Sequence, residues 1–441
     1  MKILMISLGC DKNLVDSEYM IGELLEKGYT VTDDENEADV IVVNSCCFIG
    51  DAKEESIETI LAMARHKESG RLKALIVAGC LAQRYQDEVL QELPEVDALV
   101  GTGACGSIAE AVEAALKGNT YKNFGAASRP PGTGRNKRPV TTGGHYAYLK
   151  IAEGCDKHCT YCVIPSIRGT YKSVPMEELL AQARELAAQG VRELILVAQE
   201  TTLYGKDLYG EKSLGRLLHE LNKIEGIYWI RLLYCYPEEI DDALIDAIVR
   251  NEKVVHYLDM PVQHSNDTIL KRMGRRTNAA QLADQIDLLR EKIPDICLRT
   301  TIISGFPGET REMHEGLLEF LNWAEFDRLG VFSYSPEEGT PAADFEGQID
   351  EETKLSRRDE IMELQQEIAF DLNEAMIGRE LWAFVEGKAV DEDVYVARTY
   401  RDAPGVDGYL FIHTDQELAS GAFVKVRVKS ALDYDLIGEI I

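Results

Sequence analysis

Short apolar segments alternate with helical stretches through most of this chain, and the alternation limits the folds open to it. In residues 1–118, apolar runs rich in Ile, Val and Leu are separated by segments with helical spacing. Repeating strand–helix units form parallel sheets covered by helices, so this region predicts a doubly wound α/β domain. The predicted strands are Lys2–Leu8, Val40–Ser45, Ala74–Ala78 and Ala98–Val100, and the predicted helices include Val15–Lys27, Ala52–Lys67 and Ile108–Lys117.

The same alternation returns over residues 145–370. Six strand candidates, separated by helical patterns such as Met176–Gln189 and Ala279–Lys292, are typical of a full or partial βα barrel. These candidates are Tyr146–Ile151, Glu193–Ala198, Tyr228–Tyr234, Val254–Asp259, Ile296–Ile303 and Arg328–Tyr334.

Residues 371–441 change character, because short strand patterns follow one another with no helical pattern between them. This arrangement predicts a small all-β module similar to an OB barrel. The module holds 7 basic and 14 acidic residues, so it is acidic. Its predicted strands are Trp382–Glu386, Val394–Thr399, Gly408–His413, Phe423–Lys429 and Leu436–Ile440.

A change of composition separates the first domain from the second. No Asp or Glu occurs from Ala114 to Ala152, and the Gly- and Pro-rich middle of this window predicts a linker. The chain therefore divides into an N-terminal domain (1–124), a linker (125–144), a barrel (145–370) and a β module (371–441). The basic residues of the window are Lys117, Lys122, Arg129, Arg135, Lys137, Arg138 and Lys150.

The overall composition excludes several classes of protein. Of the 441 residues, 45% are hydrophobic and 28% charged, which excludes a wholly disordered chain. No apolar run approaches the roughly 18 residues of a membrane span, and the N-terminus lacks the apolar length of a signal peptide. We therefore expect a cytoplasmic protein with no membrane partner.

The net charge indicates which class of macromolecule the protein could bind. The 47 Lys and Arg residues stand against 76 Asp and Glu residues, a formal charge of −29. Such a surface repels phosphate, which argues against nucleic acid and favours a basic macromolecular partner. The alternative is that the charge serves solubility alone.

One cysteine cluster has the spacing of a metal site. Cys155, Cys159 and Cys162 follow a predicted barrel strand, and the C-terminal mouth of a βα barrel is where its chemistry takes place. Spacings of four and three let one loop wrap three thiolates around a single centre, either an iron–sulfur cluster or zinc. A zinc knuckle with His158 or a distant Cys as fourth ligand remains the alternative.

Three further cysteines are far apart in sequence but equivalent in position. Cys10 ends ILMISLGC, Cys46 ends VIVVNSC and Cys80 ends LIVAGC, so each follows a predicted strand. The carboxyl ends of parallel strands meet at one edge of the sheet, where ligands bind. The three thiols could therefore converge on one metal cluster; alternatively, each is a separately buried thiol. Cys47 could compete with Cys46, whereas Cys105, Cys235 and Cys297 fit no spacing.

The cluster CxxxCxxC at the head of a βα barrel resembles the radical S-adenosylmethionine (SAM) enzymes. The resemblance implies a 4Fe-4S cluster held by Cys155, Cys159 and Cys162, with one iron open to SAM, and it implies that Tyr161 contacts the adenine. A turn with Gly305 and Gly308 (GFPGET) matches the family as well, and its glycines could let the backbone approach the cofactor closely. The alternative for that turn is an ordinary βα connection.

The whole chain, with its N-terminal three-cysteine domain, barrel and β module, resembles the methylthiotransferases. That resemblance implies a second 4Fe-4S cluster on Cys10, Cys46 and Cys80, where Asn-Ser-Cys46 matches the family pattern. Such enzymes replace hydrogen by a methylthio group at an unactivated carbon, using a radical derived from SAM. The chemistry is borne by the clusters, so no catalytic side chain is named. A sulfur source and an electron donor are also required.

Two branches of this family differ in substrate. Most relatives modify adenosine in transfer RNA and grip the RNA with the terminal β module, known as a TRAM domain. RimO-type enzymes modify the β-carbon of an aspartate in small-subunit ribosomal protein S-twelve. The acidic module favours the basic ribosomal protein, because an RNA-binding module should be basic. Arg398–Gly408 and Ala198–Thr202 also resemble the RimO-type sequences.

Several points stay open at this stage. Transfer RNA methylthiolation and a non-catalytic iron–sulfur or zinc scaffold are the competing functions. Arg231 and Glu200, both at predicted strand ends, are candidates to position the substrate. Asp402 and Asp407 could meet basic residues of the substrate or only shape turns.

Overall fold

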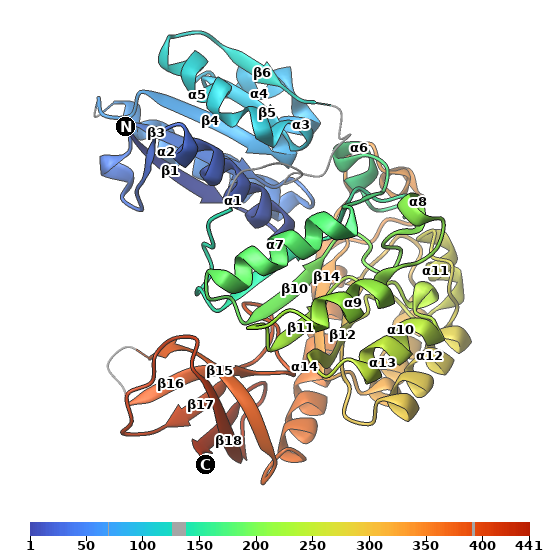
Figure 1. Cartoon of the computed structure of the whole chain (residues 1–441). Coiled ribbons are helices and arrows are strands. Elements are labelled where there is room, and N and C mark those ends of the chain that lie inside the picture. Colours follow the sequence, from blue (N-terminus) through green and yellow to red (C-terminus); the bar gives the residue numbers. More distant parts are fainter. Residues whose placement is uncertain (69, 126–137, 390–392) are drawn as a thin grey trace.

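The computed structural model describes residues 1–68, 70–125, 138–389 and 393–441. Three parts follow one another along the chain: an N-terminal α/β domain, a central curved sheet with helices, and a C-terminal β module (Figure 1). Residues 126–137, which make up most of the predicted linker, lie outside the described residues. The division at 124, 144 and 370 stays a prediction.

The N-terminal domain is a parallel six-stranded sheet in the order β2-β1-β3-β4-β5-β6. Helices lie on both faces, because successive residues of β3 enter different cores: Ile41 and Val43 pack on one face, and Val40 and Val42 on the other. The doubly wound prediction is confirmed. The strands are β1 (Lys2–Ser7), β2 (Thr30–Val31), β3 (Val40–Ser45), β4 (Ala74–Gly79), β5 (Ala98–Gly101) and β6 (Tyr121–Asn123), and the helices are α1 (Asp11–Glu26), α2 (Gly50–Ala64), α3 (Cys80–Tyr85), α4 (Asp87–Glu92) and α5 (Ile108–Leu116).

The central domain is a parallel six-stranded sheet in the order β14-β13-β12-β11-β10-β7, which forms a partial barrel. Each of the six predicted strands is present. They are β7 (Tyr146–Lys150), β10 (Glu193–Val197), β11 (Trp229–Leu232), β12 (Val254–Asp259), β13 (Cys297–Ser304) and β14 (Arg328–Ser333). Strands β8 (Ala152–Glu153) and β9 (Lys172–Ser173) form a separate two-stranded sheet.

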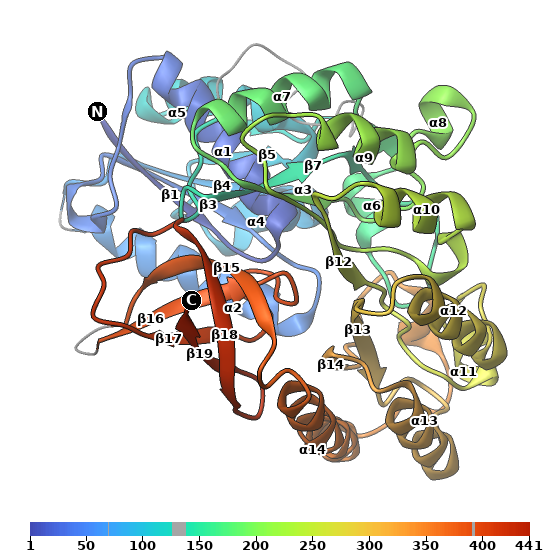
Figure 2. The same cartoon turned by 60° about the horizontal axis from the view of Figure 1, so that its bottom comes forward.

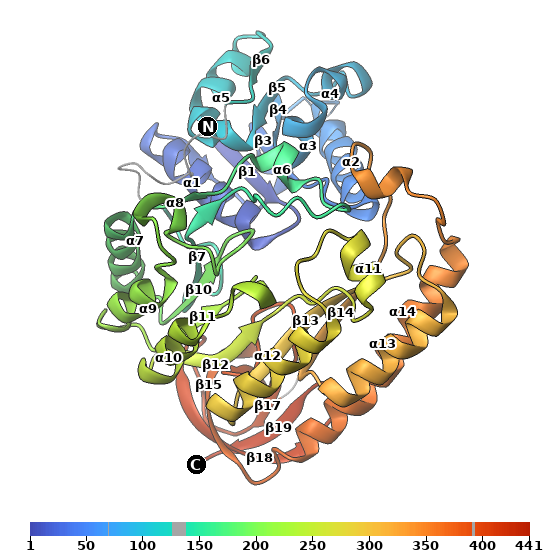
Figure 3. The same ribbon diagram turned by 90° about the vertical axis from the view of Figure 1, so that its right-hand side faces the viewer.

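Most helices of the central domain line the outside of the curved sheet, and Figure 3 shows them in sequence around its convex side. Apolar side chains from the helices and from the sheet form one continuous core between the two layers. The helices are α6 (Ile164–Arg168), α7 (Met176–Ala188), α8 (Lys206–Tyr209), α9 (Leu214–Asn222), α10 (Asp242–Arg250), α11 (Asp267–Arg272), α12 (Ala279–Lys292), α13 (Arg311–Ala324) and α14 (Glu351–Glu374).

The β module is a closed barrel in the order β15-β16-β17-β19-β18, as the sequence predicts (Figure 2). Helix α14 runs through position 370 and ends at Glu374, so it leads from the central sheet directly into the module. The strands are β15 (Glu380–Lys388), β16 (Val394–Thr399), β17 (Leu410–His413), β18 (Phe423–Ala431) and β19 (Leu436–Ile440).

Buried ion pairs hold the β module against the barrel. Glu193 of β10 accepts from Arg231 of β11 at 2.7 Å and from Arg398 of β16 at 2.8 Å. Arg231 also donates to the carbonyl of Tyr400 at 2.6 Å. Arg231 is fully buried and committed to this interface, so its candidacy as a substrate-positioning residue is wrong.

Asp402 and Asp407 serve the same interface. Asp402 accepts from Arg328 of β14 at 2.6 Å, and Asp407 accepts from the hydroxyl of Tyr257 at 2.7 Å. Both carboxylates are turned inward, and the interpretation that they contact substrate is not supported. Their partners explain the position of the loop that follows β16.

Candidate metal centres

The first group of cysteines lies at one edge of the N-terminal sheet. Cys10 lies between β1 and α1, Cys46 follows β3, and Cys80 begins α3 directly after β4. Because β1, β3 and β4 are neighbours in the sheet, with Ser7 opposite Asn44 and Ser45 opposite Gly79, their ends converge. We call these three residues the assembled triad.

Two glycines allow the strand ends to approach one another. Gly9 has φ +83°, and a Cβ on it would lie 2.7 Å from the Sγ of Cys46. Gly79 has φ +88°, and a Cβ there would lie 2.7 Å from the carbonyl oxygen of Ser45. Both positions need a residue that tolerates a left-handed backbone and has no side chain. The loops therefore form a cradle that brings Cys10 next to Cys46 and Cys80 next to β3.

Asn13 and Arg168 complete the surroundings of this triad. The amide of Asn13 donates to the carbonyls of Leu8 at 2.9 Å and Ser45 at 3.1 Å, which ties the loops after β1 and β3 together. Arg168 of the central domain places Nη2 3.6 Å from the Sγ of Cys80. Burial raises the pKa of the Cys46 and Cys80 thiols, so a metal that binds them must displace their protons.

Cys47, the competing neighbour, differs from Cys46 in its surroundings. It is fully buried in the apolar core under α2 and α3, and its burial raises the pKa of its thiol to about 12. Cys80 belongs to the same buried cluster, but Gly9 of the first loop approaches Cys46 and not Cys47. Cys105, Cys235 and Cys297 are likewise buried in the interior of their domains.

The second group of cysteines lies in one loop that follows β8. We call Cys155, Cys159 and Cys162 the local triad. Burial raises the pKa of Cys155 to about 11 and that of Cys162 to about 12. His158, with φ +52°, is exposed and directed to solvent, so nothing in the loop supports it as a fourth ligand.

The chemistry of both donor sets fits a cluster better than a single ion. In the part of the chain that the structure describes, no group of three His, Cys, Asp or Glu side chains is close enough to hold one metal ion. A four-iron cluster is several atoms across and takes cysteine sulfurs that lie farther apart. Three soft thiol donors at each place suit such a cluster.

Loop 233–236, which follows β11, lies between the two triads. The hydroxyl of Tyr234 donates to Asp11, the residue after Cys10, at 3.0 Å. The hydroxyl of Tyr236, two residues later, lies 3.6 Å from the Sγ of Cys159. One four-residue loop therefore contacts the residue after Cys10 through Tyr234 and the Sγ of Cys159 through Tyr236. We call the region along this loop, between the two triads, the gap.

Buried charges fix the N-terminal domain in this position. Asp16 of α1 and Glu153 of β8 share two cations, Lys150 and Arg168. All four side chains are almost completely buried. Helix α6 begins just after Cys162 of the local triad and ends at Arg168, which contacts Cys80 of the assembled triad. Figure 3 shows α6 between the N-terminal sheet and the barrel.

Two basic residues of the acid-free window reach the N-terminal domain. Arg138 forms an ion pair with Glu18 of α1 at 2.9 Å, and Lys150 pairs with Asp16. Part of the positive charge of that window therefore lies against acidic residues of α1. Arg129, Arg135 and Lys137 lie outside the described residues.

Tyr161 and the glycine turn lie close together on the barrel side. The ring of Tyr161 packs edge-on against Phe306 of the turn, with centroids 6.3 Å apart. The space over Gly305 is taken by Lys354, whose Cγ would lie 2.4 Å from an added Cβ, and Arg272 lies over Gly308 at 3.3 Å. The glycines thus permit close packing against side chains, and cofactor binding by Tyr161, Gly305 and Gly308 stays a prediction.

Two buried polar side chains near the local triad have unsatisfied atoms. The Oε2 of Glu200 lies 3.8 Å from the Nζ of Lys157 and has no hydrogen-bond partner among the described residues. Burial raises its pKa to about 7. Arg275 packs over the ring of Tyr236 at 4.3 Å and leaves Nε and Nη1 without partners in the same set. The sequence indicated Glu200 but gave no signal for Arg275.

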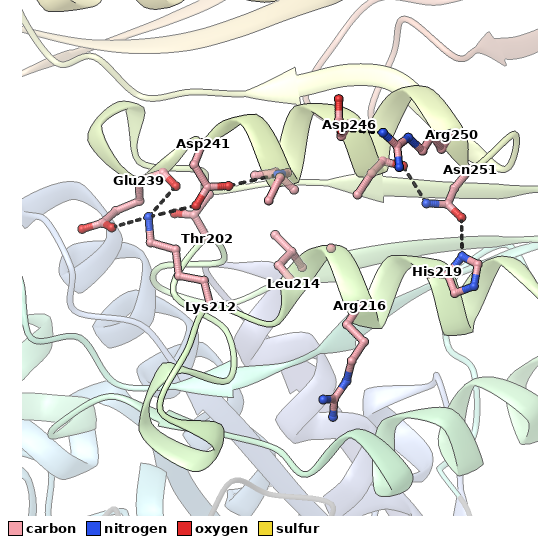
Figure 4. Close-up of a pocket in the computed structure, with 14 residues that line it drawn as sticks. Thr202, Lys212, Leu214, Arg216, His219, Glu239, Asp241, Asp246, Arg250 and Asn251 are labelled. Atoms are coloured by element: carbon pink, nitrogen blue, oxygen red, sulfur yellow. Dashed lines mark hydrogen bonds and ion pairs between the residues drawn. The ribbon is translucent and has the colours of Figure 1, made fainter.

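A groove of about 400 Å³ lies elsewhere, on the outside of the barrel between α9 and α10. Its polar side chains are largely paired with each other: Lys212 with Glu239 and Asp241, Asp246 with Arg250, and His219 with Asn251 (Figure 4). No cysteine lines it. The groove is therefore separate from the gap between the triads.

Models of three known families match successive parts of the chain. Residues 2–101 match the Uncharacterized protein family UPF0004, residues 149–321 match the Radical SAM superfamily, and residues 377–441 match the TRAM domain. The order agrees with the three structural parts. The two cysteine triads fall within or beside the first two matches.

Curated relatives match over the whole length. The ribosomal protein uS12 methylthiotransferase RimO of Lachnoclostridium phytofermentans is 58% identical over 438 residues, which cover 99% of each chain. The protein of the same name from Acetivibrio thermocellus is 51% identical and covers 100% of this chain and 98% of its own.

A solved structure shares the fold at low identity. The radical SAM methyltransferase TsrM of Kitasatospora setae, with tryptophan and a SAM analogue bound, has a TM-score of 0.56 at 13% identity. The match covers 89% of this chain and 79% of that one. At this identity the likeness shows the arrangement of the fold alone.

Proposed function

The chain belongs to the RimO family of ribosomal protein uS12 methylthiotransferases, and from this premise we propose that it transfers a methylthio group to the β-carbon of an aspartate in uS12, the small-subunit protein S-twelve. It is a radical SAM enzyme. The observation that supports the proposal is loop 233–236, which contacts Asp11 beside Cys10 of one triad and Cys159 of the other.

In this proposal each triad holds one 4Fe-4S cluster. Cys155, Cys159 and Cys162 hold the cluster that works with SAM, and Cys10, Cys46 and Cys80 hold an auxiliary one. When bound, these groups supply the one-electron chemistry that breaks an unactivated C–H bond, together with the sulfur that replaces the hydrogen. A radical source is needed because the hydrogen is too weakly acidic for any side-chain base, and the second centre would supply the sulfur.

The residues of the chain hold these centres in place and keep water out. Asn13 fixes the loops of the assembled triad, and Arg168 places a positive charge beside Cys80, where it stabilises a thiolate. Tyr161 and the turn from Gly305 to Gly308 are proposed to bound the SAM site. Arg275, with two free buried donors beside Tyr236, is suited to an anionic group on the barrel side.

The partners follow from the reaction and from charge. The net charge of −29 complements a basic ribosomal protein and favours fast encounter with it. We propose that a one-electron donor and a source of sulfur also act on the enzyme, and that it works in the cytoplasm. Over the described residues, none of the helices has the combination of length and apolarity that a membrane crossing requires.

An anaerobic assay tests the proposal. The reconstituted enzyme is reduced in the presence of SAM with either purified uS12 or transfer RNA, and the products are weighed by mass spectrometry. We expect the mass of a methylthio group on a uS12 aspartate and none on RNA. A product on RNA alone would contradict the proposal, and failure to form 5′-deoxyadenosine would favour the non-catalytic scaffold.

A further inference from the structure

Lys12 is a buried cation at the gap between the triads. It lies in the first turn of α1, two residues after Cys10, and only 6% of its surface is exposed. Its Nζ lies 3.2 Å from the ring centroid of Tyr234 and 3.1 Å from a carboxylate oxygen of Asp11. The ammonium group is therefore held where the N-terminal domain meets the loop that also contacts Cys159 through Tyr236.

Three other buried cations near the gap are more fully paired. Lys150 and Arg168 each contact two carboxylates, and Lys157 has three within 4.0 Å. Over the described residues Lys12 contacts one, and that oxygen of Asp11 also accepts from Tyr234. An ammonium group has three donors, so Lys12 has capacity for a second anion.

The substrate brings such an anion into the gap. In an aspartate side chain, the carboxylate is one bond from the β-carbon, so a β-carbon placed between the triads puts a negative charge beside α1. Burying that charge without a cation is costly. Lys150 demonstrates that a buried ammonium in this chain accommodates two carboxylates, Asp16 and Glu153.

Position distinguishes Lys12 from Arg275, another buried cation with free donors. Arg275 packs over Tyr236, on the side of the local triad, whereas Lys12 packs over Tyr234 on the side of the assembled triad. We infer that Lys12 binds the side-chain carboxylate of the target aspartate and selects aspartate over its neutral isostere, asparagine. This inference rests on the function proposed above and assigns a specificity-determining residue for it.

Binding measurements with matched pairs test the inference. The anaerobic holoenzyme and its Lys12→Met and Lys12→Arg variants are titrated with uS12 carrying Asp or Asn at the target position, and Kd is measured for each pair. We expect the wild type to prefer the Asp form by about tenfold or more, as for a hydrogen bond between charged groups. Lys12→Met should bring the ratio close to one, and Lys12→Arg should keep most of it.

Controls separate this role from a structural one. Iron and sulfide content and 5′-deoxyadenosine formation without uS12 report the integrity of both centres, and Lys27→Met removes an exposed lysine just after α1. If Lys12→Met loads poorly, Lys12→Gln gives the same comparison with a side chain that still forms hydrogen bonds.

Two negative results are distinguishable. An unchanged Asp/Asn ratio in a fully loaded Lys12 variant overturns the inference and leaves the proposed function intact. A wild type that methylthiolates no uS12 contradicts the proposed function itself, and the inference fails with it.

Discussion

The two triads reach the same kind of donor set by opposite routes. The local triad lies within eight consecutive residues, Cys155–Cys162, and depends on the conformation of one loop. The assembled triad draws on three strand ends spread over seventy residues and depends on sheet register and on two glycines with positive φ. The geometry of a local site changes little when packing changes elsewhere in the fold. The geometry of an assembled site changes whenever the packing between its strands changes.

Removing the thiols should give the largest effect and separate the triads. Replacing Cys155, Cys159 and Cys162 by Ala should abolish methylthio transfer and leave about four irons per chain, held by the assembled triad. Replacing Cys10, Cys46 and Cys80 should also leave about four, with 5′-deoxyadenosine formation retained. Anaerobic iron and sulfide analysis measures both. The single variant Cys47→Ala serves as control, and loss of all iron in either triple variant would show that the sites are not independent.

A change in the packing alone should harm only the assembled triad. Gly79→Ala adds a Cβ that would lie 2.7 Å from a backbone oxygen at a φ of +88°. We expect a loss of about 2 to 4 kcal/mol in the free energy of unfolding and fewer bound irons. Urea unfolding and iron analysis measure the two effects.

Gly28→Ala is the matched control for this change. Gly28 has φ +85° but no atom within 4 Å of an added Cβ, so it isolates backbone strain of about 1 to 2 kcal/mol. Equal losses of stability and iron in the two variants would refute the argument from close approach.

The smallest effect concerns Glu200, beside the local triad. Its pKa of about 7 in the folded chain exceeds the ordinary value, so the folded state binds the proton more tightly. Stability should therefore fall as pH rises from about 4.5 through 7, by up to about 3 kcal/mol. Glu200→Gln should flatten this fall in urea unfolding between pH 5 and pH 8.

Glu177→Gln, which changes an exposed carboxylate on α7, provides the comparison for Glu200→Gln. It should follow the pH profile of the wild type. Parallel profiles for all three proteins would mean that Glu200 is ionised throughout this range in the folded chain.

The sequence predicted what depends on local pattern. Continuous apolar runs such as Val40–Ser45 predicted the inner strands β3, β4 and β5 of the N-terminal sheet within one residue, and the local triad was visible as a motif. The proximity of Cys10, Cys46 and Cys80 could also be predicted, because the carboxyl ends of parallel strands lie at one edge of the sheet. The edge strand β2, only two exposed residues long, carries no such pattern.

The residues that the sequence assigned wrongly, or left unassigned, depend on how domains dock. Arg231 lies on a barrel strand, yet its partners include the carbonyl of Tyr400, 169 positions away. Asn13, Arg168 and Lys12 look like ordinary helix residues until the N-terminal domain meets the barrel. Periodicity describes an element by itself, and these roles exist only between elements.

A buried set of charges makes each of the first two domains depend on the other. Its members are Asp16, Lys150, Glu153 and Arg168. Neither domain holds a balanced set, because Asp16 comes from the first and the other three from the second. Removing Asp16 from the first domain would leave an excess of positive charge buried in the second, at a penalty of several kcal/mol. A change of charge at any of these four positions therefore requires a compensating change in the other domain.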